Sequence, residues 1–234
     1  MKKSEMGKRL DNRGAALATV IVVVAIVSVL ATTFLYVSGK NYFMKVTDQK
    51  TKMSFYQAET ALEEIKAELM ELSSEAGAKA YMDVLVQYSS SDGYSRYSAY
   101  RSSYFAELAG LWEAKRTADP ANVMTYEQLL QSCADPIYAS ALTLDATLSD
   151  AGTMDISHST DGYALLKGVC IEYTDADGYT TIITTDYLFT VPELNWSVDQ
   201  ALTDWSDGTY EPEKLKRDTV DMSECVQYCN WVKK

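Results

Sequence analysis

One short stretch of the sequence gathers the residue types that a hydrolase uses. Within seven residues it supplies carboxylates, a hydroxyl and the chain's single imidazole: Asp155, Ser157, His158 and Asp161. A serine hydrolase needs its nucleophile on a sharp turn, with backbone donors beside it for the oxyanion, and neither signature is present. With one histidine in 234 residues, little imidazole is left for other catalysis. We therefore expect a protein that is not an enzyme.

Two further groups contain residue types that bind metals. Asp175, Asp177 and Gly178 resemble part of a calcium loop, but the distal glutamate of such a loop is missing. Cys225 and Cys229 are four residues apart, which would place them on one face of a helix, yet neither a CxxC pair nor a histidine at zinc spacing accompanies them. The sequence predicts a turn without metal at Asp177–Gly178, and no cofactor.

The cysteines form an even set: Cys133, Cys170, Cys225 and Cys229. In an exported domain such a set predicts one or two disulfides, whereas in the cytosol the same residues would be thiols. Sequence spacing leaves the connectivity open. We expect a disulfide from one of the last two cysteines to one of the first two.

The charge is distributed unevenly along the chain. The formal net charge is -12, and residues 1–14 carry five basic and two acidic side chains, so the rest of the chain sums to about -15. Such an acidic surface repels phosphate, and we expect no nucleic-acid partner. The 17 tyrosines and 4 tryptophans supply aromatic material for a core.

An apolar run from Ala15 to Val37 contains no charged residue and no proline. As a helix it would be about 34 Å long at 1.5 Å per residue, enough to cross a hydrocarbon layer of roughly 30 Å. The run is too long for a cleaved secretory signal, and no small-residue cleavage site follows it. It therefore predicts a retained membrane helix. Five basic residues before it favour a cytoplasmic N-terminus, although four lysines follow at positions 40–52.

The junction before this run resembles a type IV prepilin processing site. A short basic leader ends in Asn12, Arg13 and Gly14, and Ala15, Ala16 and Leu17 open the apolar segment. The resemblance implies that a membrane peptidase cuts between Gly14 and Ala15 and that the new N-terminus is methylated. Glycine suits such a cut because it has no side chain to obstruct the peptidase.

A second stretch, Ser54 to Leu69, is similar to the segment that follows the membrane helix in PilX-type minor pilins, including the Ala58–Glu59 pair. The resemblance covers about residues 13–72. Most major pilins have a glutamate at the fifth mature position, which pairs with a neighbouring N-terminal amine; here that position is Thr19. In lacking this glutamate the chain resembles GspK-type tip pseudopilins, which implies a minor or tip subunit.

The resemblance also implies the partners and the residues of assembly. Partners would be other pilins or pseudopilins, the prepilin peptidase, the inner-membrane assembly platform and membrane lipid. The chain would be a single-pass membrane protein with an extracellular C-terminal domain, and after assembly part of a cell-surface filament of a type IV pilus or type II secretion-like system. The assembly residues would be Leu17, Thr19, Val20, Phe55, Ala58, Glu59 and Leu62.

The expected fold is α+β, with one long N-terminal helix packed on a globular domain of helices and an antiparallel sheet. The segments are a leader (1–14), a membrane or filament-core helix (15–38), its amphipathic continuation (39–72) and the globular domain (73–234). Helix propensity drops at Ser38 and Gly39, where we expect a bend. Beyond it, apolar residues at spacings of three and four predict a stripe that packs on the domain: Phe55, Ala58, Leu62, Ile65, Leu69 and Leu72.

Further elements follow from the later pattern. A Tyr-rich stretch at 89–104 leads into a helical pattern whose tyrosine face is either half-buried or adhesive. Helix is expected around Tyr126–Cys133, and an irregular loop at 149–162. Alternation over 168–191 predicts a β-hairpin with a turn at Asp177–Gly178, and the tail from Val220 to Trp231 is expected to be a short helix.

An alternative function is an uncleaved, signal-anchored ectodomain that acts as an adhesin, a sensor or a binding module. In that case the acidic, Tyr-rich domain would be the working part. Processing of the leader discriminates between the two, because only a pilin would lose residues 1–14.

Overall fold

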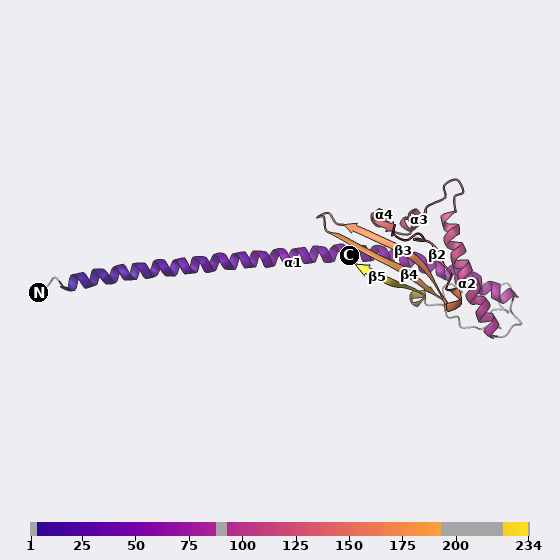
Figure 1. Cartoon of the computed structure of the whole chain (residues 1–234), viewed down its shortest axis with the longest axis horizontal. Coiled ribbons are helices and arrows are strands. Elements are labelled where there is room, and N and C mark those ends of the chain that lie inside the picture. Colours follow the sequence, from indigo (N-terminus) through magenta and orange to yellow (C-terminus); the bar gives the residue numbers. More distant parts are fainter. Residues whose placement is uncertain (1–3, 88–92, 193–221, 234) are drawn as a thin grey trace, which may run out of the picture. The chain divides into compact units, whose positions relative to one another are not determined.

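The computed structural model describes residues 4–87, 93–192 and 222–233 and divides into two compact units, Met1–Lys52 and Met53–Lys234. A long N-terminal helix, shorter helices and an antiparallel sheet make up an α+β fold, as the sequence predicts (Figure 1). Helix α1 runs from Ser4 to Gln87, 15 residues beyond the expected end of the amphipathic segment. The boundary between the units falls at Lys52–Met53, so residues 53–72 belong to the compact C-terminal unit.

Helix α1 is continuous through Ser38 and Gly39, so the expected bend is not accompanied by a break in the helix. A single glycine costs about 1 kcal/mol relative to alanine in a helix interior, which a helix of this length can absorb. A Cβ added at Gly39 would meet no atom within 4 Å. The glycine is therefore not required by close packing inside the protein.

Three further helices belong to the C-terminal unit: α2 (Gly93–Arg116), α3 (Tyr126–Ser132) and α4 (Pro136–Ala139). Helix α3 begins at a capping box, in which the Thr125 hydroxyl accepts from the Gln128 backbone N–H and the Gln128 side chain accepts from the Thr125 N–H. Helix α4 begins with Asp135 as N-cap and Pro136 in its first turn, where a missing N–H costs nothing. Local sequence thus determines both helix starts.

The sheet is antiparallel, with strand order β1-β3-β4-β5 and β2 paired to β3. Its strands are β1 (Leu142–Leu144), β2 (Met154–Asp155), β3 (Tyr163–Thr174), β4 (Thr180–Thr190) and β5 (Val226–Lys233). Strands β3 and β4 form the expected hairpin, although β3 begins at Tyr163 rather than near 168. Gly178 has φ of 83°, as the Asp-Gly turn predicts. The 149–162 segment is mostly irregular but contains β2 and the 3-10 helix η1 (Ser159–Asp161).

The helix expected at the C-terminal tail is wrong. In the described part of that segment, a 3-10 turn η2 (Met222–Glu224) leads into β5, which pairs with β4; Val220 and Asp221 lie outside the described residues. Without this strand, the β4 edge would present a row of unpaired backbone donors and acceptors. As a strand, the tail gains hydrogen-bond partners on β4 for its backbone N–H and C=O groups, which a short tail helix would not supply.

Two irregularities in the sheet meet at one carboxylate. The β3–β4 register shifts between Leu166 and Val169, and the β4–β5 register shifts between Thr184 and Asp186. Asp186 accepts from the Gly168 backbone N–H at 2.8 Å and from the Asn230 side-chain amide at 2.7 Å. Both partners have positive φ, 72° and 52°. A single side chain therefore holds two bulges together.

The core lies between the C-terminal part of α1, helix α2 and the sheet. The expected stripe is buried from Ala58 onward, and Phe55 is half-buried against it. On α2, Tyr100, Tyr104 and Leu108 are fully buried, so the tyrosine face belongs to the core. Residues 89–92 of the Tyr-rich stretch lie outside the described part of the chain. Tyr104 and Ser73 share a buried hydrogen bond of 2.6 Å that joins α2 to α1.

Truncating the centre of this core should destabilise the domain. Leu62 is fully buried, and Leu62→Ala should lower the free energy of unfolding by about 2–5 kcal/mol because it leaves a cavity. The matched control is Thr60→Ala on the exposed face of the same helix, with an expected change within about 0.5 kcal/mol. Urea unfolding followed by tryptophan fluorescence measures both, and equal effects would contradict the assigned packing.

Candidate functional site

The N-terminal unit presents an apolar helix whose side chains are exposed all around. From Leu17 to Val37 the large apolar side chains are between 49% and 74% exposed. This segment is long and apolar enough to cross a membrane, and its most apolar stretch is not buried inside the protein. A soluble helix would show a one-sided apolar stripe, whereas apolar residues on all sides fit a lipid or helix-lined environment.

Polar side chains within the apolar segment satisfy their hydrogen bonds locally. The Thr19 hydroxyl donates to the Ala15 carbonyl at 2.9 Å, and Ser28, Thr32 and Thr33 donate to carbonyls three or four residues earlier. In lipid every polar group must find a partner within the segment. These hydroxyls therefore do not oppose insertion into a hydrocarbon layer.

The expected processing site lies on this helix. Gly14 and Ala15 are exposed, and a Cβ added at Gly14 would meet no atom within 4 Å. Packing inside the protein therefore does not require a glycine at this position. The bond between the two residues lies inside α1, so a peptidase must unwind the helix locally, which glycine makes easier.

The structure places the predicted assembly residues in two different environments. Leu17, Thr19 and Val20 are exposed on the apolar segment. Ala58 and Leu62 are fully buried in the domain core, with Phe55 and Glu59 half-buried beside them. The Leu62 carbonyl also accepts from the Tyr187 hydroxyl at 2.8 Å. Ala58 and Leu62 thus serve the fold of their own domain.

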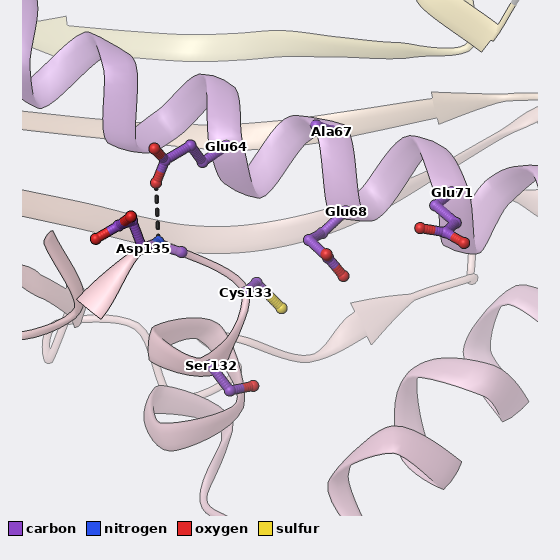
Figure 2. Close-up of a pocket in the computed structure, with 8 residues that line it drawn as sticks. Glu64, Ala67, Glu68, Glu71, Ser132, Cys133 and Asp135 are labelled. Atoms are coloured by element: carbon purple, nitrogen blue, oxygen red, sulfur yellow. Dashed lines mark hydrogen bonds between the residues drawn. The ribbon is translucent and has the colours of Figure 1, made fainter. Parts of the chain in front are cut away.

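A surface pocket of about 460 Å³ lies between α1 and α3 and carries several carboxylates (Figure 2). Its lining residues are Glu64, Ala67, Glu68, Glu71, Ser132, Cys133, Ala134 and Asp135. Glu64 accepts from the Asp135 backbone N–H at 2.9 Å, and Glu68 pairs with Lys115 of α2 at 2.8 Å. Two of the acids therefore join α1 to the elements around it.

The thiol in this pocket is held in its protonated form. Burial raises the pKa of Cys133, and its sulfur donates to the Leu129 carbonyl. A thiolate is the nucleophilic species, so the raised pKa does not favour reactivity, and the side chain packs in the core cluster. Within residues 14–84, 95–192 and 222–233, no cluster of three or more His, Cys, Asp or Glu side chains is arranged to hold a metal ion.

The expected disulfide is not formed in the structure. All four cysteines are thiols, with Cys133 and Cys225 buried and Cys170 and Cys229 half-buried. Cys170 lies on β3 and Cys229 on β5, with β4 between them. Two strand spacings amount to roughly 9.6 Å, beyond the reach of about 7 Å between Cα atoms that a disulfide allows. That pairing is incompatible with the sheet.

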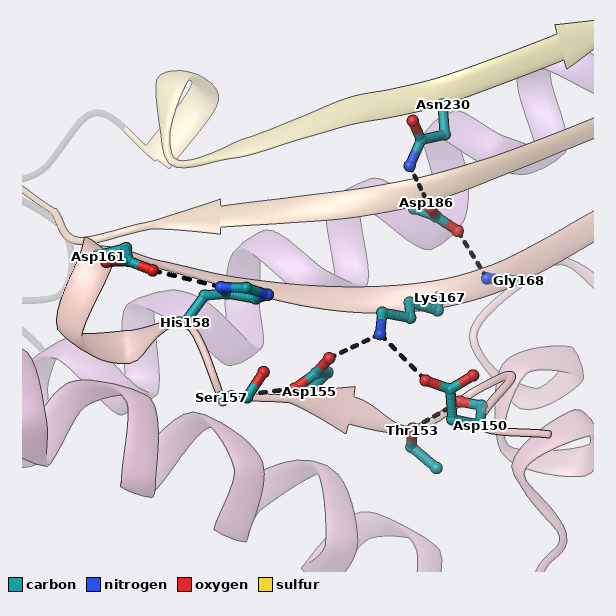
Figure 3. A network of polar contacts seen from close by, with 10 residues as sticks. All are labelled: Asp150, Thr153, Asp155, Ser157, His158, Asp161, Lys167, Gly168, Asp186 and Asn230. Carbon is teal, nitrogen blue, oxygen red and sulfur yellow. Dashed lines mark hydrogen bonds and ion pairs between the residues drawn. The ribbon is translucent and has the colours of Figure 1, made fainter. Parts of the chain in front are cut away.

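A polar network organises the loop before β3 (Figure 3). Lys167 donates to Asp155 at 2.7 Å and to Asp150 at 3.0 Å, and Asp155 also accepts from the Ser157 backbone N–H at 2.9 Å. These hydrogen bonds, from Lys167 above all, hold the pKa of the Asp155 carboxyl well below its usual range. One lysine thus ties two points of the loop to the sheet.

The hydrolase residue types do not assemble into a catalytic triad. His158 Nδ1 lies 3.3 Å from Asp161, and its ring stacks on Tyr163 with centroids 4.7 Å apart. Ser157 enters the network through its backbone N–H to Asp155. In Figure 3 the Asp155 and His158 side chains turn to different partners. The arrangement stabilises a loop and shows no nucleophile held by a base.

Sequence reasoning missed Lys167 and Asp186, which hold the loop and the bulges. A lysine and an aspartate at inner strand positions are a signal, because charged residues there require partners. Gly152 was also missed. Its carbonyl accepts from the buried Trp112 indole at 3.0 Å, and a Cβ there would lie 2.7 Å from Tyr126 Cβ.

Removing the lysine of the network should make stability depend differently on pH. Lys167→Met should lower the free energy of unfolding at pH 7 by about 1–2 kcal/mol, because Asp155 and Asp150 lose their partner. The pKa of Asp155 is lower in the folded state than in the unfolded state, where it is about 3.9. The ionised carboxylate therefore stabilises the folded protein above about pH 4, and this stabilisation is lost as the pH falls toward the folded-state pKa. The difference from wild type should therefore shrink below about pH 4.

The control for this comparison is Lys79→Met, which breaks an exposed ion pair with Glu75 on α1. Its cost should stay below about 0.5 kcal/mol at every pH. Urea titrations from pH 2 to 7 measure both variants. A Lys167→Met difference that is constant with pH would show that the Asp155 carboxylate does not carry the effect.

No protein-family model matches this chain, and comparisons with curated proteins and with solved structures give no match.

Proposed function

We propose that this chain is a minor subunit of a type IV pilus or type II secretion-like filament, held in the membrane before assembly. The observation that carries the proposal is the apolar segment of α1, exposed around its circumference and starting directly behind the Gly14–Ala15 junction. In this role the same surface first contacts lipid and is then buried among the corresponding helices of other subunits. The globular domain, residues 73–234, would face the outside of the cell.

The proposal is supported by the different environments of the two parts of α1. Residues 15–37 have no partner surface in their own unit, whereas the stripe from Ala58 to Leu72 is buried in the globular unit. One helix thus combines a hydrophobic anchor and the backbone of a folded domain. A filament subunit needs both, because the domain must follow the anchor when it leaves the membrane.

Thr19 supports a place at the filament end. Its hydroxyl bonds the Ala15 carbonyl and carries no charge, so it cannot pair with the amine of a neighbouring subunit as a glutamate would. A subunit that lacks this charge is suited to initiating a filament rather than joining its shaft.

The alternative, an uncleaved anchored domain with an adhesive tyrosine face, has less support. Tyr100 and Tyr104 are buried in the core, with burial raising the pKa of both phenols, and Tyr97 is exposed. The face that could have been adhesive is mostly used for packing. This alternative remains an outcome of the processing experiment below.

Processing should remove the leader. In cells that contain a prepilin peptidase, the mature N-terminus should be a methylated Ala15, measured by intact mass and N-terminal sequencing. Gly14→Val should abolish cleavage because the side chain blocks the close approach of the peptidase. The control is Gly39→Val on the same helix, where a Cβ also meets no atom within 4 Å and cleavage should continue. Mature protein that begins at Met1 would support the alternative.

Position in the filament should depend on residue 19. Immunogold labelling of the wild-type domain should mark filament ends, and Thr19→Glu should move label into the shaft because the charge partner is restored. Thr19→Val, which also removes the hydroxyl but adds no charge, should keep the label at the ends. Wild-type label along the shaft would contradict the tip assignment.

A further inference from the structure

At the C-terminal end of the apolar segment and directly beyond it, α1 carries aromatic and basic side chains together. Tyr36, Tyr42 and Phe43 are 64%, 66% and 71% exposed. Lys40 and Lys45 stand between and beside them and are also exposed. We call this group, from Tyr36 to Lys45, the collar; it contains no acidic residue.

The collar spreads over more than half of the helix circumference, an arc of about 220°. At about 100° per residue, the aromatic rings lie at about 0°, 240° and 340° and the two lysines at about 40° and 180°. A surface made for one protein partner would confine all of these residues to a narrower stripe, about 100° wide. A helix that stands alone in a layer of headgroups meets the same chemistry on every side. The distribution therefore favours lipid as the partner.

The axial position matches the edge of a bilayer. Leu17 to Tyr36 spans about 29 Å of helix, close to the hydrocarbon thickness of roughly 30 Å. Tyr36 to Phe43 adds about 10 Å, and the headgroup layer on one side is about 5–8 Å thick. Helical side chains lean toward the N-terminus, so the Tyr42 and Phe43 rings reach back toward the membrane. Tyrosine and other amphipathic rings are enriched at this level.

The side-chain contacts within the collar also agree with a position at the membrane surface. Lys40 Nζ lies 5.3 Å from the Tyr36 ring centroid, one turn toward the apolar segment. The Tyr42 and Phe43 rings meet edge to face at 6.1 Å. The lysine amine thus lies beside Tyr36, and in a membrane that ends near this ring it would stand close to the level of the lipid phosphates. An ammonium at that height attracts anionic headgroups.

Charge supplies one competitor. The unit Met1–Lys52 carries nine basic and three acidic residues, a net charge of +6, which leaves -18 on Met53–Lys234. The acidic unit of a second copy is therefore also complementary to the lysines. It offers no reason for exposed aromatic rings at the end of an apolar segment of bilayer length, and we treat it as an outcome to be excluded.

We propose that the collar is an interfacial docking segment that binds anionic phospholipid headgroups and sets the depth of the helix in the membrane. The proposal rests on the membrane-anchoring part of the proposed function only. It does not require leader cleavage or filament assembly, so loss of either would leave it standing.

The test uses the full chain in vesicles of phosphatidylglycerol and phosphatidylethanolamine. A photo-crosslinking phenylalanine analogue replaces Phe43, and mass spectrometry identifies the adducts after illumination. We expect phospholipid adducts in which the ratio of phosphatidylglycerol to phosphatidylethanolamine is at least about fivefold above that of the vesicle, because each lysine near an anionic surface contributes about fivefold in binding. Lys40→Gln combined with Lys45→Gln should return the adducts to the vesicle composition.

The control variant is Lys79→Gln, which removes a lysine from the same helix inside the globular unit and should leave the enrichment unchanged. Two results would overturn the proposal. Covalent dimers as the main product would show that the collar docks on a second copy. Lipid adducts that follow the vesicle composition in the wild-type protein would show that the lysines do not select anionic headgroups.

Discussion

The burial of the α1 stripe in the globular unit is the interaction on which the rest of the domain depends. Small residues recur on the buried face, at Ala58, Ala61, Ala76 and Ala80, and let other elements approach the helix closely. Polar groups then fix its position: Ser73 bonds Tyr104 of α2, and the Leu62 carbonyl accepts from a tyrosine of β4. Apolar burial supplies the driving force, and the hydrogen bonds select one register.

The same helix meets a different physical demand before Lys52. A water-soluble helix places apolar residues every three or four positions, and α1 does so only from Phe55 onward. Upstream, apolar side chains point in every direction and their polar neighbours are satisfied by backbone carbonyls of the preceding turn. This change of pattern is the one expected where a helix passes from lipid or a bundle of helices into the core of a domain. Without lipid or other helices around it, the upstream part would expose a large apolar surface to water.

Periodicity explains which parts of the fold could be predicted from the sequence. The apolar stripe and the β3–β4 hairpin were predictable because each has a strong local period, and the Asp-Gly turn has a known backbone demand. The strand β5 was not, because it is stabilised by pairing with β4, a partner distant in sequence. The bulges at Gly168 and Asp186 also depend on non-local contacts. For the candidate site, the apolar segment was predictable, whereas the role of Lys167 required knowledge of where the loop lies.

Ser54 lies at the start of the globular unit, and its hydroxyl affects how a pulling force on α1 reaches the domain. The side chain is fully buried and reaches the Tyr179 carbonyl and the Thr181 hydroxyl, both at 3.1 Å, beside the turn of the hairpin. Tension applied along α1 from its N-terminal end would therefore be passed to the sheet through this residue. It would be shared at once with two long strands whose ladder bonds resist together. The hydrogen bonds of Ser54 would thus distribute the load over the sheet, so that the buried stripe of α1 is not separated from the core one helical turn at a time.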